Sequence, residues 1–298
     1  MNTRVTQGMM NNQLLRNINA NLSRINNHQN QLSTGRKINK PSDDPVGISF
    51  SLRYRSENSA NDQYISNVDA ATSWLDYTDT TLNQANSVMQ RVRELAVNAS
   101  NGTNPQSALD AIKKEVDQLK EQMVTIGNSQ FNGKYVFNGQ LTDKQPYTSA
   151  TAATDKVDQG QIQFDIGVGV RVAANISGDK IFGATGANDN IFRVMDDLSA
   201  ALASGNQQAI GACIGRLDTR NDAFLQARAD VGAKQNRIEL AQSRLKDIST
   251  NLQTLQSKAE DADIPGVITN LKTDENVYNA SLSVGSKIIS TSLVDFLR

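Results

Sequence analysis

The sequence contains very little cysteine or histidine, and each shortage excludes a class of site. Among 298 residues there is one cysteine, Cys213, so an intramolecular disulfide is impossible. The single histidine, His28, excludes every zinc site that needs two histidine ligands. The net charge is only -1, which gives no indication of a nucleic acid or an anionic membrane as a partner. We therefore expect no metal and no cofactor.

Long apolar runs and aromatic residues are also scarce. No run approaches the length of a membrane span, and the first residues lack the basic-then-apolar layout of a cleaved signal peptide. If the protein leaves the cell, we expect it to be exported by a pathway that does not require such a signal peptide. Aromatic residues make up 5% of the chain, while Asn, Gln, Ser and Ala are frequent, which favours an elongated helical protein with a thin core.

A regular apolar seam runs from Ile238 to Ala262. Its members recur in alternating steps of three and four residues, and the intervening positions are mostly charged or polar, as in a coiled-coil strand. A helix with one apolar stripe is not stable alone in water, so the seam needs a partner of similar length. The residues expected in this core seam are Ile238, Leu245, Ile248, Leu252 and Leu255.

Other long helical patterns supply such partners. One runs from about 46 to 99 and stops at a turn over 100–105, and the next runs from 109 to 126. A short turn between two long helices makes them antiparallel neighbours. A helix is also expected over 188–204, followed by a long one from about 207 to 263.

Residues 127–187 have a different composition, with concentrated glycine and aromatic residues and almost no helical period. Short strands are predicted at 135–138, 161–168 and 170–176. This segment is interpreted as a small β insert between helices.

Each end of the chain carries one amphipathic stripe, set off from the centre by proline. Neither end can bury its stripe alone, so we expect the ends to pair with each other or with other copies. Because asparagine, a poor helix former, crowds the first segment, we expect the ends to be disordered until something covers them. The residues expected at the assembly interface are Leu15, Ile18, Leu22, Ile25 and Leu32 at the N-terminal end, and Leu271, Tyr278, Leu282, Ile289 and Phe296 at the C-terminal end.

Together these patterns predict a mainly α fold with a small β insert (α+β). The helices of the N- and C-terminal halves form an elongated antiparallel coiled-coil-like bundle, with disordered or helical termini. Three parts are expected: terminal polymerisation segments at 1–40 and 265–298, a central helical bundle at 41–130 and 188–264, and the β insert at 131–187.

Two motifs flank the central body. Leu32-Ser33-Thr34-Gly35-Arg36-Lys37-Ile38-Asn39, with acidic residues soon after it, and Ala259-Glu260-Asp261-Ala262-Asp263 resemble the two signatures of the flagellin superfamily. The resemblance covers about 1–130 and 205–298. The signature residues are Leu32, Gly35, Ile38, Asn39, Asp43, Asp44, Gly47, Glu260, Asp261 and Asp263.

Within the superfamily, residues 128–139 and 229–239 are similar to the corresponding segments of proteins that join the flagellar hook to the filament. The resemblance implies a self-assembling structural protein outside the cell, exported by a type III route without a cleaved signal. It implies four partners: further copies of itself in a ring or collar, an adjacent hook-associated junction protein, flagellin, and an export chaperone. Nucleic acid and membrane are not expected partners.

The sequence leaves three rival functions. A flagellin filament subunit is the first alternative, and a surface adhesin whose β insert binds carbohydrate is a more distant one. An enzyme is the weakest, because no catalytic constellation is present: His28 is typical of a solvated or interface histidine, and Cys213 of a small buried residue. The acidic residues near the end of the seam are expected to line a kink and to pair with basic residues such as Lys258, rather than to bind a cation. They are Glu260, Asp261 and Asp263.

Overall fold

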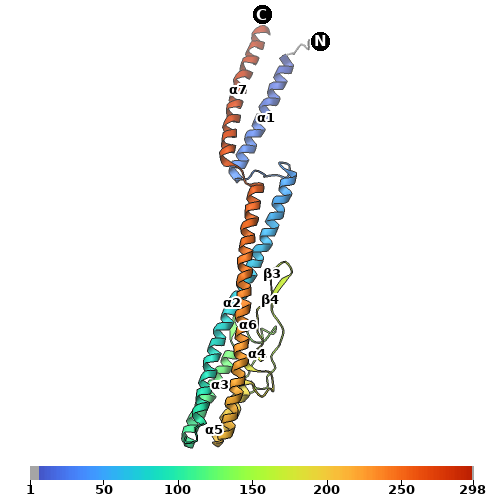
Figure 1. Cartoon of the computed structure of the whole chain (residues 1–298). Coiled ribbons are helices and arrows are strands. Elements are labelled where there is room, and N and C mark those ends of the chain that lie inside the picture. The colour runs from blue at the N-terminus through green and yellow to red at the C-terminus, as the bar shows by residue number, and fades with distance from the viewer. Residues whose placement is uncertain (1–6, 297–298) are drawn as a thin grey trace. The chain divides into compact units, whose positions relative to one another are not determined.

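The structure, a computed structural model, describes the backbone of residues 7–296 and the side chains of residues 8–287 (Figure 1). Long helices dominate it, which confirms the predicted mainly α fold with a small β insert. The helices are α1 (Gln7–Thr34), α2 (Pro45–Ala99), α3 (Gln106–Gly127), α4 (Gly178–Phe182), α5 (Ile191–Ser204), α6 (Gln207–Glu260) and α7 (Ile264–Phe296). The strands are β1 (Gln130–Phe131), β2 (Lys134–Tyr135), β3 (Gln163–Gly167) and β4 (Val170–Ala173).

The chain forms two compact units: unit 1 comprises 1–60 and 249–298, and unit 2 comprises 61–248. This division differs from the three parts expected from the sequence. The boundary falls inside α2 and α6, which continue without a break, rather than at the prolines. The insert at 131–187 belongs to the same unit as the helices around it.

In unit 2, α6 runs antiparallel to α2, and polar side chains link the two helices along their length. Arg228 Nε donates to Asp79 Oδ1 at 3.1 Å, and Asn61 Nδ2 donates to the carbonyl oxygen of Leu245 at 3.0 Å. Ile238 and Leu245 are buried, with 1% and 5% of their surfaces exposed. Helix α2 is therefore the partner that the apolar seam of α6 requires.

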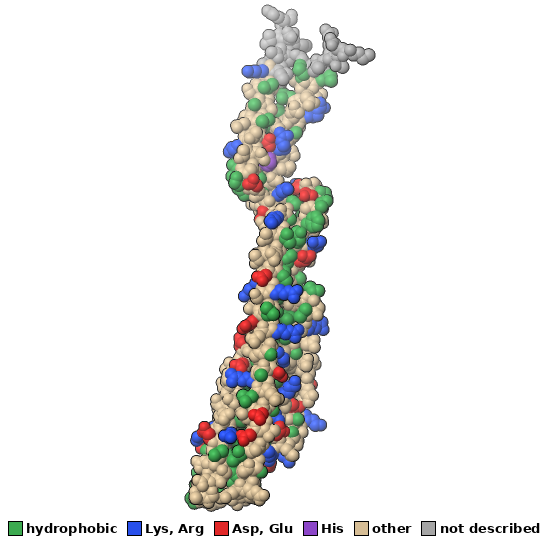
Figure 2. All heavy atoms as spheres, viewed as in Figure 1, with side chains coloured by type: hydrophobic (Ala, Val, Ile, Leu, Met, Phe, Trp, Pro, Cys, Tyr) green, Lys and Arg blue, Asp and Glu red, His purple; other side chains and the backbone are tan. Residues whose placement is uncertain are grey.

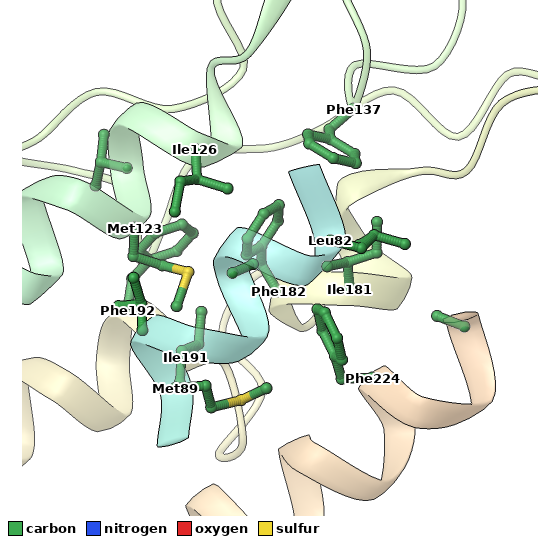
Figure 3. Packing of buried hydrophobic residues seen from close by; sticks show 14 of the residues in the cluster. Leu82, Met89, Met123, Ile126, Phe137, Ile181, Phe182, Ile191, Phe192 and Phe224 are labelled. Carbon is green, nitrogen blue, oxygen red and sulfur yellow. The ribbon is translucent and has the colours of Figure 1, made fainter. Parts of the chain in front are cut away.

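The core of unit 2 draws on its helices and on the insert together, and α3 packs against α5 there (Figure 3). Phe182 of α4 lies 5.5 Å from Phe137 and 5.4 Å from Tyr147 between ring centroids. Tyr147 in turn lies 4.8 Å from Phe192 of α5. Because the insert places its aromatic rings in the common core, it does not form a unit of its own.

The two sheets are antiparallel hairpins. β1 and β2 are joined by Asn132 and Gly133, whose φ angles of 51° and 75° suit a tight hairpin turn. The strand predicted at 135–138 is wrong: β2 ends at Tyr135, and the residues after it fold into the core without pairing as a strand. The predicted strands at 161–168 and 170–176 are present in shorter form as β3 and β4, and α4 was not anticipated.

No described helix combines the length and the apolar character needed to cross a membrane.

Candidate assembly interface

The two terminal helices of unit 1, α1 and α7, pack against each other (Figure 1). Arg24 Nε lies 3.2 Å from Asp274 Oδ1, and His28 Nε2 lies 3.5 Å from Asp274 Oδ2. Further along, a Cβ atom added at Gly285 would lie 2.8 Å from Leu14 Cδ2. The ends of the chain therefore pair with each other, one of the two arrangements that the sequence left open.

The less exposed side chains of α1 follow one face of the helix in alternating steps of four and three residues. Of the residues expected at the assembly interface, Ile18, Ile25 and Leu32 belong to this face. Leu15 and Leu22 lie outside it, with 57% and 37% of their surfaces exposed, so they are not part of the α1–α7 seam within one chain. The face that is covered consists of Leu14, Ile18, Asn21, Ile25, His28 and Leu32.

Helix α7 shows a similar division between covered and exposed residues. Leu271 is buried, with 9% of its surface exposed, and Tyr278 is half-buried. Leu282 is 44% exposed, and the neighbouring stripe of Val277 and Val284 is 43% and 53% exposed. The remaining predicted interface residues, Ile289 and Phe296, lie outside the part of the chain whose side chains are described.

The seam between α1 and α7 is thin and partly polar. Asn21 is 5% exposed inside it, and the Oδ1 atom of Asn11 is buried without a hydrogen-bond partner. Among the described side chains of unit 1, the buried hydrophobic ones are Ile25, Ile38 and Leu271. A buried acceptor without a partner costs roughly 1–3 kcal/mol, so this pairing is weakly stabilised for its length.

Below the terminal pair, residues 35–47 and 256–263 form a structure that we call the clasp. Lys37 N donates to the carbonyl oxygen of Glu260 at 2.6 Å, and Ala262 N donates to that of Gly35 at 3.0 Å. Between these bonds Arg36 and Asp261 form an antiparallel bridge. The two signature motifs, more than 200 residues apart in sequence, are therefore bonded directly through their backbones.

Glu260 anchors the clasp to α2. Its carboxylate is almost fully buried and accepts hydrogen bonds from Ser51 Oγ at 2.7 Å, from Gln256 Nε2 at 2.5 Å and from Arg55. Burial alone would raise the pKa of Glu260, but these bonds and the charge of Arg55 lower it to about 2. The expected pairing with a basic residue is present, but the partner is Arg55 of α2 rather than Lys258.

The other signature residues shape the loop between α1 and α2. Helix α1 ends before Gly35, whose left-handed φ of 69° is typical of the residue that follows the last turn of a helix. Asp44 Oδ1 accepts from the backbone N of Gly47 at 2.9 Å and caps α2. Asp43 Oδ2 accepts from the backbone N of Asn39 at 3.0 Å. The hydrogen bonds of Asp43 and Asp44 thus stabilise the fold of the clasp. The part of the chain that the structure describes contains no cluster that could hold a metal ion.

A further exposed surface was missed by the sequence reasoning. Figure 2 shows hydrophobic side chains gathered over the first turns of α2, where Val46 and Phe50 are 64% and 45% exposed. With Tyr54 they recur every four residues, a signal that was present in the sequence. Leu255 of unit 1, near the end of α6, is also 42% exposed, so placing it in the core seam is wrong. Leu252 of the same unit and Ile248 of unit 2 are half-buried.

These features define a mainly helical protein whose two ends fold together into one unit. The bacterial flagellin N-terminal helical region matches residues 5–142, and the flagellin C-terminal helical region matches residues 214–297. A flagellin from Halalkalibacterium halodurans is 30% identical, over 84% of this chain and 82% of that protein. The chain belongs to the flagellin family and is a structural component of the bacterial flagellum.

Two further comparisons concern proteins of the hook region. Flagellar hook-associated protein 3 of Salmonella typhimurium is 24% identical, over 93% of this chain and 96% of its own length. The crystal structure of Bacillus cereus FlgL superposes with a TM-score of 0.60 at 21% identity, over 69% of this chain and 99% of that one. At this level of identity, the likeness to FlgL shows a shared fold.

Proposed function

We propose that this protein is a non-enzymatic subunit of the flagellar hook–filament junction that assembles through α1 and α7. The observation that carries the proposal is the apolar surface left beside the α1–α7 seam. Leu15 and Leu22 on α1 are seven residues apart and are 57% and 37% exposed, and Val277 and Val284 on α7 have the same spacing and are 43% and 53% exposed. A seven-residue spacing is that of a helix-packing stripe, so each terminal helix keeps a second stripe for a neighbouring subunit.

Covering these stripes by a neighbouring subunit should give a substantial favourable free energy of association. Burying one Leu or Val side chain stabilises by about 1.5–3 kcal/mol, and every subunit contributes several such residues. By contrast, the seam between α1 and α7 within one chain gains less from apolar burial, because it contains the polar residue Asn21 and the Oδ1 atom of Asn11, which has no hydrogen-bond partner. Contacts between copies therefore complete a unit that one chain leaves poorly covered.

Placement at the junction is supported by how the comparisons cover the chain. The match to hook-associated protein 3 runs over 93% of this chain, whereas the match to the Halalkalibacterium flagellin runs over 84%. Immunogold labelling of isolated flagella tests the placement. Label at a single position where hook meets filament is expected, and label along the whole filament would overturn it.

The partners in this proposal are sister copies in a ring or collar, an adjacent hook-associated junction protein, flagellin, and a chaperone during type III export. The ends are proposed to order fully only on assembly. Amide exchange on the purified monomer tests this: fast exchange in α1 and α7 with slow exchange in unit 2 is expected. Equal protection of both units would contradict it.

A filament subunit remains the second candidate, favoured by the higher identity to flagellin of 30% against 24% for hook-associated protein 3. Adding purified monomer to filament seeds separates the two functions. A junction protein stops after a short collar, whereas a filament subunit elongates without limit.

A further inference from the structure

An open groove of about 860 Å³ lies in unit 2, outside the terminal helices and the clasp. One wall is α2 at Ser73 and Trp74, and another is the β1–β2 hairpin at Phe131. The third side is formed by Ile162, which precedes β3, and by Phe164 within β3. Its volume lies within the range of roughly 300–1,000 Å³ that is typical of small-ligand sites.

Aromatic and aliphatic side chains line part of this groove. The ring of Phe131 stands edge-on to Trp74, with centroids 5.8 Å apart, and lies 5.3 Å from Tyr77. Trp74 is 6% exposed, and its indole Nε1 is a buried donor without a hydrogen-bond partner. A buried indole N–H usually finds a partner, so this wall retains an unused donor.

The rest of the lining is rich in neutral amides. Asn132, Gln140, Gln161 and Gln163 line the groove, and Gln161 and Gln163 are exposed. Each amide carries two N–H donors and one acceptor, although Gln140 Nε2 already donates to the carbonyl oxygen of Gln161 at 2.9 Å. Lys134 is the only charged side chain among the lining residues, and none is a carboxylate. A lining in which neutral amides outnumber charged groups suits a ligand that carries many hydroxyl groups.

An extended peptide fits the groove less well. A peptide usually gains affinity by adding a strand to a free sheet edge. One edge of β3 pairs with β4, and on the other side Asn67 Nδ2 of α2 donates to the carbonyl oxygen of Asp165 at 2.9 Å. A strand added at the second edge of β3 would therefore have to compete with the hydrogen bond from Asn67.

We propose that this groove binds a short neutral saccharide. The rings of Phe131 and Phe164 supply apolar surface for the C–H faces of the sugar, while the four amides hydrogen-bond its hydroxyls. The site joins the insert to α2, so the insert alone lacks one wall and the whole chain is needed for binding. The inference goes beyond the assembly role and does not depend on it.

Trp74, the only tryptophan of the chain, provides the readout. The full-length protein is titrated with maltotriose, cellotriose, mannotriose and triacetylchitotriose while tryptophan fluorescence is followed. At least one trisaccharide should change the emission saturably. The double variant Gln161→Ala/Gln163→Ala should bind that sugar about tenfold more weakly. Gln118→Ala, an exposed glutamine on α3 away from the groove, is the matched control and should bind as the parent does.

Several outcomes would overturn the proposal. They are the absence of a saturable change with all four sugars at millimolar concentration, equal affinity in the double variant and the parent, and stronger binding of a neutral peptide than of any sugar. Because both glutamines are exposed, the double variant should fold as the parent does. Matching circular dichroism spectra would verify that weaker binding does not come from unfolding.

Discussion

The two units of this protein solve the problem of burying apolar surface in opposite ways. Unit 2 encloses a continuous core with the aromatic rings of Phe137, Tyr147, Phe182 and Phe192 at its centre. Unit 1 buries few hydrophobic side chains and leaves many exposed. Its exposed large hydrophobic residues are Met9, Met10, Leu15, Leu22, Val46, Phe50, Leu52, Leu255, Ile264, Ile268, Val277, Leu282 and Val284.

This difference shows how one chain can be both stable and ready to assemble. Unit 2 buries a large core shared by its helices and the insert. Unit 1 is held by specific polar contacts at the clasp rather than by a large core, so its apolar stripes stay available. A large exposed apolar surface on a soluble protein usually marks an interaction site.

The largest effect is expected in the core of unit 2. Phe192 is fully buried, with its ring 4.8 Å from Tyr147 and 5.5 Å from Phe182. Phe192→Ala should lower the free energy of unfolding by about 3–5 kcal/mol, because it removes the ring and leaves a cavity. Urea unfolding followed by circular dichroism measures this. A loss below about 1 kcal/mol would mean that unit 2 is not the self-sufficient part.

The next effect concerns the buried carboxylate of the clasp. Glu260→Gln should destabilise unit 1 by about 1–3 kcal/mol near neutral pH, because it removes the charge that Arg55 and Ser51 face. Urea unfolding of both proteins across a pH series is the measurement. Glu239→Gln, at an exposed position of α6, should have no effect and serves as control.

The pH dependence of that difference has a definite sign. The folded-state pKa of Glu260 is about 2, below the value of about 4.3 for an unfolded glutamate. The stabilisation is therefore complete above about pH 5 and is lost as the pH falls toward 2. The parent and the Gln variant should converge in stability at low pH, and a constant gap between pH 7 and pH 3 would contradict this assignment.

A smaller effect is expected at Gly47. An added Cβ would lie 2.6 Å from Ile38 Cδ1 and closer still to the Asp44 carboxylate. Gly47→Ala should cost about 1 kcal/mol of stability in unit 1, since both neighbours must shift. Gly232→Ala on α6 is the matched control: nothing lies within 4 Å of its added Cβ, so it should stabilise by up to about 1 kcal/mol. Thermal melts that rank the two variants in the opposite order would refute the close-packing argument.

The long helices and the amphipathic stripe at each end could be predicted from the sequence, because apolar spacing and proline breaks are local signals, but whether the ends pair within one chain or between copies could not. The face of α1 that meets α7 could not. Leu14 and Leu15 are adjacent, and the period alone does not decide which of them faces Gly285. The bond between Arg55 and Glu260 joins residues 205 positions apart and leaves no local signal.

In the insert, too, local sequence signals do not reveal contacts between distant residues. Its composition predicted short strands, but Tyr147 and Phe182 pack on the helices, which no strand period indicates. The groove also went unnoticed, because it is made where Trp74 of α2 meets the hairpin.

The most direct test of the account compares stability with assembly in one variant, Leu15→Ser/Leu22→Ser. Both residues are exposed in the monomer, so its melting temperature should change by less than about 2 °C. The same variant should fail to incorporate into flagella when it replaces the parent protein in motile cells. Normal incorporation and swimming would contradict the claim that these stripes complete unit 1 by contact with neighbouring subunits.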